Sequence, residues 1–235
     1  MWNGKNKALT FSFDDGVLQD IRAIEILDKY GLKATFNLNS CLLGNVRTLD
    51  QKGRPVVNHS KVQPKDVKEV YKNHEVAVHT KTHPNLTGLE DKEVINEVEN
   101  DRQILSALCG YEVVGMAYPC GGVNNDDRVA KIIKEYTGVK YSRTITSVHN
   151  FDLQDNLYRF NPSIYYLEKD KMFDLAKKFI ELKTDTPQIF YIWGHTYEMD
   201  YNNPQFTSWQ DFEEFCALVS GKDDIFYGTN KEILL

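Results

Sequence analysis

The stretch ALTFSFDDG at residues 8–16 decides the fold of this chain. Phe11 and Phe13 alternate with small polar residues until two carboxylates and a glycine end the pattern. This predicts a half-buried strand with Asp14 and Asp15 at its carboxyl end. A strand closed by an ordinary Asp-Asp-Gly turn fits equally well when the stretch is taken alone. The rest of the chain must therefore decide whether these carboxylates have a chemical role.

Two later stretches place polar side chains at the same kind of position. HTKTH at residues 79–83 and WGH at residues 193–195 both end apolar runs. Three separate strands are thus predicted to present carboxylates or imidazoles at their carboxyl ends. In α/β folds, active sites form at that edge of the sheet, so we expect catalytic chemistry there.

The composition is that of an ordinary soluble globular protein, with 41% hydrophobic and 26% charged residues. A chain of 235 residues is routine for one α/β barrel, so we expect a single domain over residues 1–235. No apolar run approaches the roughly 18 residues that span a bilayer. A net charge of -6 argues against a nucleic-acid groove, which needs clustered Lys and Arg. We therefore expect neither a membrane nor a nucleic-acid partner.

The first residues, MWNGKNK, contain no apolar signal-peptide core. This predicts a cytoplasmic protein, although a secreted protein whose leader had been removed would look the same. The cysteines show no CxxC spacing, and free thiols are favoured over disulfides. The cysteines are Cys41, Cys109, Cys120 and Cys216.

Helical and strand patterns alternate along the chain, which predicts an α/β fold. The number of units favours a distorted (β/α) barrel with about seven parallel strands, and a doubly wound open sheet is the alternative. Residues 39–63 have no clean period and are predicted to form a long insertion beside the site. After the opening strand, strands are expected at 32–38, 75–78, 111–118, 139–142, 144–148, 188–193 and 224–227. Helices are expected at 17–30, 65–72, 89–108, 126–136 and 168–182, with a last helix through residue 219 capped by Thr207 and Gln210.

One carboxylate and two imidazoles can form a mononuclear hydrolytic metal site with a position left for water or substrate. Asp15, His79 and His83 supply such a set. Pro84 disfavours helical geometry at His83, so the two histidines are not a helical pair. Zn²⁺ suits these ligands, while Co²⁺ and Fe²⁺ accept the same arrangement. We expect one divalent ion.

A hydrolytic site also needs groups that move protons. Asp14 adjoins Asp15, and on a bent strand end one carboxylate can bind the metal while the other takes the proton of an activated water. This division requires the cation, because two bare carboxylates side by side would raise one another's pKa. His195 supplies a general acid for the leaving group, since imidazole titrates near neutral pH.

Four motifs in this order resemble the polysaccharide deacetylases of carbohydrate esterase family four, which carry the NodB homology domain. They are TFSFDDG at 10–16, HTKTH at 79–83, AYPCG at 117–121 and WGH at 193–195, so the resemblance spans about residues 8–200. It implies a distorted TIM-like barrel and a metal-dependent hydrolase that removes N- or O-acetyl groups from a poly- or oligosaccharide. An acetylated carbohydrate would be the substrate.

The resemblance gives the base, the acid and the three metal ligands the same roles as above, and it adds two more. Thr80 would hold the histidine loop by a hydrogen bond. The backbone amide of Cys120 would join the metal in stabilising the oxyanion, a role that needs no particular side chain.

The chain departs from the family pattern in two motifs. Many members have Arg where this chain has Ala117, followed by Tyr118 and Pro119, and that Arg holds the base; some relatives share Ala-Tyr-Pro. No Asp-Trp pair matches the fourth motif, which orients the acid and walls the acetyl pocket. Arg159 is the candidate for the missing cation and Trp193 for the missing wall, with Tyr118 as a further supporting or substrate-contacting residue. A surface arginine and a core tryptophan are the ordinary alternatives.

Two other functions stay open. The first is a hydrolase of small cyclic or linear amides on the same scaffold. The second is a carbohydrate-binding relative without turnover, which is disfavoured because a binding module needs neither Asp14 nor His195. His59, His74 and His149 have no partner at ligand spacing and are interpreted as ordinary histidines. The sequence leaves the sugar, the linkage and the oligomeric state open.

Overall fold

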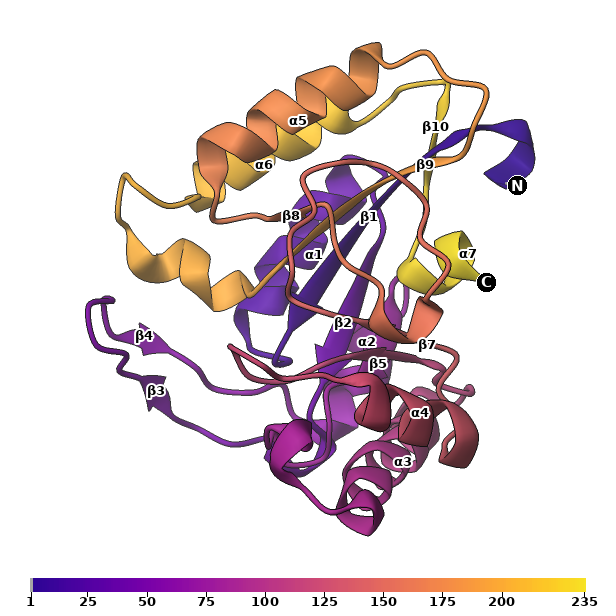
Figure 1. Cartoon of the computed structure of the whole chain (residues 1–235). Helices are drawn as coiled ribbons and strands as arrows, with labels where there is room; N and C mark the ends of the chain where they lie inside the picture. Colours follow the sequence, from indigo (N-terminus) through magenta and orange to yellow (C-terminus); the bar gives the residue numbers. More distant parts are fainter. Residues whose placement is uncertain (1) are drawn as a thin grey trace.

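The structure is a computed structural model that describes residues 2–235. A curled parallel sheet forms its centre, with strand order β7-β6-β5-β2-β1-β9-β8 (Figure 1). The predicted α/β fold, a distorted barrel with about seven parallel strands, is thus confirmed. The strands are β1 (Lys7–Asp14), β2 (Ala34–Leu38), β5 (Glu75–Val78), β6 (Gly115–Ala117), β7 (Tyr141–Arg143), β8 (Ile164–Tyr165), β9 (Gln188–Gly194) and β10 (Ile225–Tyr227).

The barrel is distorted at two places. β10 pairs with β1 at residues 7–9, whereas β2 pairs with β1 at residues 11–14, so the two strands follow one another along one edge of β1. At the outer strands, a single parallel bridge joins Arg143 of β7 to Phe160, which lies just before β8.

Alternation along β1 divides its side chains between two environments. Phe11 and Phe13 pack edge-on against Phe212 of the last long helix, and all three rings are buried. The polar residues between them face the interior of the barrel, where Ser12 accepts a hydrogen bond from Asn37 of β2 at 2.8 Å. The strand that the opening stretch predicted therefore exists, but it is buried on both faces rather than half-buried, with apolar groups under the helices and polar groups inside.

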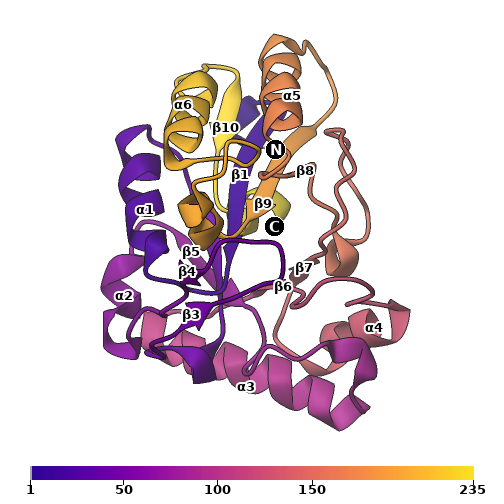
Figure 2. The ribbon, with the colours of Figure 1, turned by 90° about the vertical axis from the view of Figure 1, so that its left-hand side faces the viewer.

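Helices cover the outside of the sheet, and Figure 2 shows α5 and α6 at the opposite end of the molecule from α3. The longest begins with a capping box between Glu90 and Glu93 and ends at Gly110, whose φ of 80° a side chain would strain. None of the helices within residues 2–235 is long and apolar enough to cross a membrane. The helices are α1 (Gln19–Lys29), α2 (Val67–Val70), α3 (Asp91–Cys109), α4 (Asp127–Tyr136), α5 (Lys169–Glu181), α6 (Trp209–Val219) and α7 (Asn230–Leu234).

Two local predictions need correction, and a third gains detail. Residues 144–148 form no strand. The N–H of Thr144 donates to the carbonyl of Phe160, and no ladder of backbone hydrogen bonds continues beyond it. The cap of α6 is Ser208 with Asp211, since Thr207 instead donates its hydroxyl to the carbonyl of Tyr166. The insertion at 39–63 contains a short antiparallel hairpin of β3 (Thr48–Leu49) and β4 (Val57–Asn58), which lies at the left in Figure 1.

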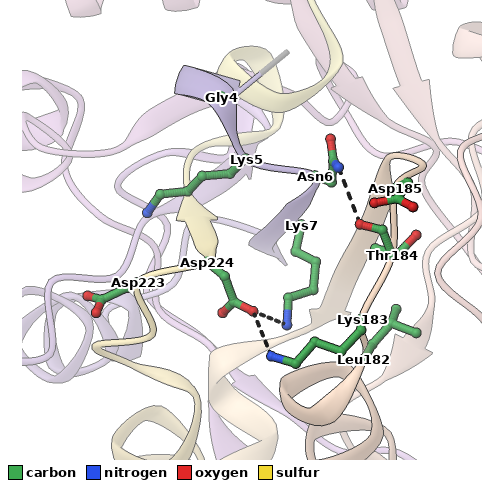
Figure 3. A pocket seen from close by; sticks show the side chains of 10 residues that line it. All are labelled: Gly4, Lys5, Asn6, Lys7, Leu182, Lys183, Thr184, Asp185, Asp223 and Asp224. Carbon is green, nitrogen blue, oxygen red and sulfur yellow. Dashed lines mark hydrogen bonds and ion pairs between the residues drawn. The ribbon is translucent and has the colours of Figure 1, made fainter.

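The amino ends of the strands border a polar groove of about 450 Å³. Lys7 lies beneath it with its ammonium group paired to Asp224 at 2.9 Å (Figure 3). The same nitrogen donates to the carbonyls of Phe179 and Ile180, both at 3.0 Å. The buried ammonium group of Lys7 is therefore matched by protein acceptors.

Candidate active site

The carboxyl ends of the strands meet at a cavity of about 560 Å³. Asp14 ends β1, and the other side chains come from the turns that follow their strands: Asp15 after β1, His79 after β5, Cys120 after β6 and His195 after β9. Parallel pairing carries these turns to one edge, which is why residues far apart in sequence line one cavity.

Asp15, His79 and His83 form a compact group. One ligand atom of each lies within 4.8 Å of the others. His79 Nδ1 lies 2.9 Å from the carbonyl of Ala117, an arrangement that orients the ring and leaves Nε2 for the cavity. The donor types and their separation suit a small divalent cation.

The loop that carries the two histidines is held from several sides. The hydroxyl of Thr80 accepts a hydrogen bond from the backbone N–H of His83 at 3.1 Å. The side chain of Asn39 donates to the carbonyls of His79 at 2.6 Å and Thr80 at 2.9 Å. These contacts fix a backbone in which Thr80 and His83 both have positive φ.

Helix α3 supplies two further anchors that the sequence did not indicate. Glu97 accepts from the backbone N–H of Thr82 at 2.8 Å and from its hydroxyl at 2.9 Å. Asp101, one turn later and fully buried, accepts from the N–H of Ser40 at 2.7 Å and of His79 at 3.2 Å. The histidine loop therefore rests on buried carboxylates of a rigid helix.

Asp14 is held between a guanidinium group and an amide. Arg143, which is fully buried, contacts both carboxylate oxygens of Asp14 at 2.5 Å. Asn37 donates to the same carboxylate at 2.8 Å. Burial opposes ionisation of Asp14, yet Arg143, with His79 and His195, holds its pKa below the usual value. The carboxylate is thus kept ionised in a buried position.

The assignment of Arg159 as the cation that holds the base is wrong. Its guanidinium bonds instead to Asn125 at 2.8 Å and to Asp127 of α4 at 2.5 Å, at the surface. Arg143 takes the position beside Asp14 because β7 directs that side chain into the barrel. The sequence contained this arginine in the stretch YSR, but nothing in its pattern distinguished it.

His195 lies on the other side of the cavity. Its Nδ1 is 3.2 Å from Glu198, and its Nε2 is 4.0 Å from Asp14. Glu198 also accepts a hydrogen bond from the hydroxyl of Tyr165. Glu198, three residues after the histidine, therefore pairs with it in charge and accepts from its backbone N–H at 3.2 Å, where the family pattern implies an Asp-Trp pair.

Trp193 and Tyr165 form an aromatic wall of the cavity. Their rings stack with centroids 4.6 Å apart, and the guanidinium of Arg143 lies 4.6 Å from the Trp193 ring. Tyr118 also borders the cavity, but it is fully buried and donates its hydroxyl to the carbonyl of Tyr158 at 2.8 Å. Tyr118 therefore supports the site from behind.

The turn after β6 is fixed by Asn124, whose side chain donates to the carbonyls of Pro119 at 3.0 Å and Cys120 at 2.8 Å. Cys120 has a φ of 68°. Its backbone N–H has no acceptor within residues 2–235. An amide donor without a partner beside the cavity is suited to a developing negative charge. The Cys120 thiol itself points towards His83, with Sγ 3.8 Å from Nδ1.

His59 belongs to the site, contrary to its interpretation as an ordinary loop histidine. Its Nε2 lies 3.1 Å from Asp15, and its Nδ1 accepts from Arg47 at 3.1 Å. Lys61, also buried, donates to the carbonyl of Asp15 at 2.7 Å. The insertion thus folds back and braces the carboxylate of Asp15.

Burial and charge separate the histidines into two kinds. Burial lowers the pKa of His79 to about 4 and also lowers that of His83. Burial alone would lower the pKa of His195 as well, but Glu198 and the two aspartates raise it to about 9. At neutral pH the first two are neutral imidazoles, which can bind a cation, and His195 is protonated.

Comparison with known families identifies the class. Residues 3–141 match the family model for polysaccharide deacetylase, and the chain belongs to that family. The sequence has no match among curated proteins.

Solved structures share the fold at low sequence identity. Peptidoglycan deacetylase PdaC from Bacillus subtilis is 17% identical over 97% of this chain and 90% of its own, with a TM-score of 0.55. A family 4 carbohydrate esterase from Streptomyces lividans, in complex with acetate, is 14% identical over 96% of this chain and 93% of its own, with a TM-score of 0.57. A mutant of BA3943, a CE4 family pseudoenzyme with restored enzymatic activity, is 17% identical over 98% of this chain and 68% of its own, with a TM-score of 0.59.

Proposed function

We propose that this protein is a metal-dependent hydrolase that removes acetyl groups from a carbohydrate. One observation carries the proposal: Asp14, held by Arg143, and His195, held by Glu198, flank the Asp-His-His group in one cavity. The family supports it, since its relatives include a peptidoglycan deacetylase and a carbohydrate esterase in complex with acetate.

Asp15, His79 and His83 would hold the ion, and Zn²⁺ fits one carboxylate and two neutral imidazoles best. When bound, a divalent cation lowers the pKa of its water to about 7 and polarises a carbonyl. The lowered pKa values of His79 and His83 favour binding, because a protonated imidazole has no free electron pair for a metal.

Two residues move protons in this proposal. Asp14 accepts the proton of the attacking water, and Arg143 keeps it ionised and oriented towards the cavity. His195 donates a proton to the departing sugar nitrogen or oxygen. The backbone N–H of Cys120 donates to the developing oxyanion, while Trp193 and Tyr165 confine the acetyl group.

The alternative of a binding protein without turnover has a specific motive, since two solved neighbours are forms of a CE4 family pseudoenzyme. In this chain the base and the acid are both present, and each has a buried charged partner. Burying these partners has a cost that sugar binding alone does not require. The arrangement therefore favours an enzyme.

Acetate release tests the proposal. The chain would be incubated with N-acetylated chito-oligosaccharides and O-acetylated xylan, with Zn²⁺, Co²⁺ or Fe²⁺ and with a chelator. We expect metal-dependent acetate release from at least one sugar. A panel of small cyclic and linear amides serves as the competing substrate class. Amide hydrolysis without acetate release would replace the deacetylase by the amide hydrolase, and no turnover of either class would leave the binding protein.

A further inference from the structure

We propose that the β3–β4 hairpin makes the cavity selective for an acetylated saccharide that carries a negative charge, through the guanidinium groups of Arg47 and Arg54. This inference rests on the proposed function, because it names the class of sugar that the same site would take. Both arginines line the cavity that contains the Asp-His-His group. Arg47 lies just before β3, and Arg54 lies between β3 and β4.

The two arginines lack carboxylate partners. Within residues 2–235, neither forms an ion pair with an Asp or Glu side chain. This sets them apart from the arginines that do form such pairs, which are Arg102, Arg128, Arg143 and Arg159. The two guanidinium groups thus face the cavity without a carboxylate to neutralise their charge.

Arg54 is pre-organised although it has no ion partner. Its guanidinium lies 4.1 Å from the Phe206 ring and 5.6 Å from the Tyr201 ring. Its Nη1 is shielded from solvent and has no hydrogen-bond partner in the described part of the chain. A buried donor without an acceptor costs free energy. Stacking on aromatic rings also reduces the entropy lost when the group binds.

Arg47 is fixed at one end and free at the other. Its Nε donates to His59 Nδ1 at 3.1 Å, while its two terminal nitrogens find no acceptor within residues 2–235. Backbone bonds hold the base of the hairpin, with the N–H of His59 donating to the Arg47 carbonyl at 2.9 Å. The planar end of the guanidinium is therefore available for two parallel hydrogen bonds to one anion.

The carboxylates of the cavity cannot serve as partners, because each is already occupied. Asp14 binds Arg143, Asp15 binds His59, and Glu198 accepts from Tyr165. The occupant that satisfies the hairpin must come from the substrate. A carboxylate or phosphate matches a guanidinium in charge and shape. A cavity of about 560 Å³ lies within the usual range for small-molecule sites.

Three acetylated sugars distinguish binding of the charge from binding of the sugar ring. N-acetylglucosamine is neutral, N-acetylmuramic acid carries a carboxylate, and N-acetylglucosamine 6-phosphate carries a phosphate. Their affinities for the metal-loaded protein would be measured by ligand-observed NMR titration at low ionic strength. We expect at least one anionic sugar to bind about tenfold more tightly than the neutral one, as charged hydrogen bonds allow. Whichever anion is preferred identifies the group as carboxylate or phosphate.

Variants assign that preference to the hairpin. Arg54→Gln should reduce the preference to less than about threefold, and Arg47→Gln with Arg54→Gln should abolish it. Arg22→Gln is the matched control: Arg22 also lacks an ion pair within residues 2–235 and stacks on Trp209 at 4.5 Å, but it does not line the cavity. It should bind like the wild type. Because these variants leave the metal ligands in place, a direct contact between the anion and the metal would survive in them.

Two results would overturn the inference: equal binding of all three sugars by the wild type, or an anion preference that persists in the double variant. Acetate release from N-acetylated chito-oligosaccharides and O-acetylated xylan is a separate readout. Anion preference without acetate release would support the hairpin site and reject the deacetylase. Acetate release without anion preference would support the deacetylase and reject the hairpin site.

Discussion

The two ends of the barrel show what a structural and a functional arrangement of charge look like. At the amino end, Lys7 is matched by Asp224 and two backbone carbonyls. At the carboxyl end, two adjacent aspartates share a cavity with histidines of opposite protonation. The backbone is strained there, with positive φ at four non-glycine residues, Asp15, Thr80, His83 and Cys120.

Backbone strain is concentrated at the cavity, since four of the seven non-glycine residues with positive φ within residues 2–235 lie there. A non-glycine residue in the left-handed region costs on the order of 1–3 kcal/mol, and such residues persist only where surrounding bonds hold them. Asn39, Asp101 and Asn124 supply those bonds at the carboxyl end. Substitutions at the carboxyl end should therefore affect turnover, whereas a substitution at the amino end should affect stability alone.

The largest effect is expected from Asp14→Asn. The amide keeps the shape of the side chain but cannot accept a proton from water. We expect kcat for acetate release to fall by roughly 10²–10⁴-fold, with metal content unchanged. Steady-state kinetics and elemental analysis on the same sample measure both quantities. Near-wild-type kcat with metal retained would remove Asp14 from the mechanism.

Arg143→Met should affect both turnover and stability. It leaves the buried Asp14 carboxylate without its cation, which costs about 3–5 kcal/mol of unfolding free energy for a buried pair. The pKa of Asp14 should rise, so the acid limb of the pH profile should move to higher pH. Arg159→Met, at the surface, is the matched control and should change neither. If both variants behaved alike in the pH profile, the role of Arg143 in holding the base would be rejected.

Glu198→Gln should move the alkaline limb. The raised pKa of His195, about 9, keeps it protonated at neutral pH, and activity should fall as pH rises through that value. Removal of the Glu198 charge lowers this pKa, so the fall should begin at lower pH, with kcat reduced about 10-fold at neutral pH. The pH dependence of kcat measures the shift. An unchanged alkaline limb would mean that His195 is not the acid or that Glu198 does not control it.

Lys7→Met should have the smallest effect on turnover. It removes the ion pair and carbonyl bonds at the amino end, which should lower the unfolding free energy by about 1–3 kcal/mol. The value of kcat should stay at the wild-type level, because no cavity residue contacts Lys7. Denaturant unfolding and acetate release test the two halves. A kcat loss at a temperature where the variant is folded would contradict the separation of the two ends.

The sequence predicted the site residues that lie in motifs at the ends of strands. Asp14, Asp15, His79, His83 and His195 follow strands whose hydrophobic pattern is clear, and parallel pairing alone brings strand ends together. The sheet itself was predictable for the same reason. β8 was not predicted, because it is only two residues long, Ile164–Tyr165, and lies in an aromatic and polar segment without a hydrophobic period.

The supporting residues were harder to predict because their contacts are long-range or unpatterned. Arg143 lies 129 residues from Asp14, in a short strand whose register decides which side chain points inward. His59 comes from an insertion without a period, so nothing indicated that it returns to Asp15. Glu198 did carry a signal, since it follows His195 by three residues in a turn. Arg159 was chosen in place of Arg143 because the sequence does not show the direction of either side chain.

Metal content tests the central claim most directly. Wild-type protein and His79→Ala would be loaded with Zn²⁺, dialysed against a weak chelator and measured by elemental analysis. We expect one Zn²⁺ per wild-type chain and a loss of stoichiometric metal in His79→Ala, with the folded state of both verified by circular dichroism. Stoichiometric metal in His79→Ala, or none in the folded wild type, would contradict the assignment of Asp15, His79 and His83 as a metal site.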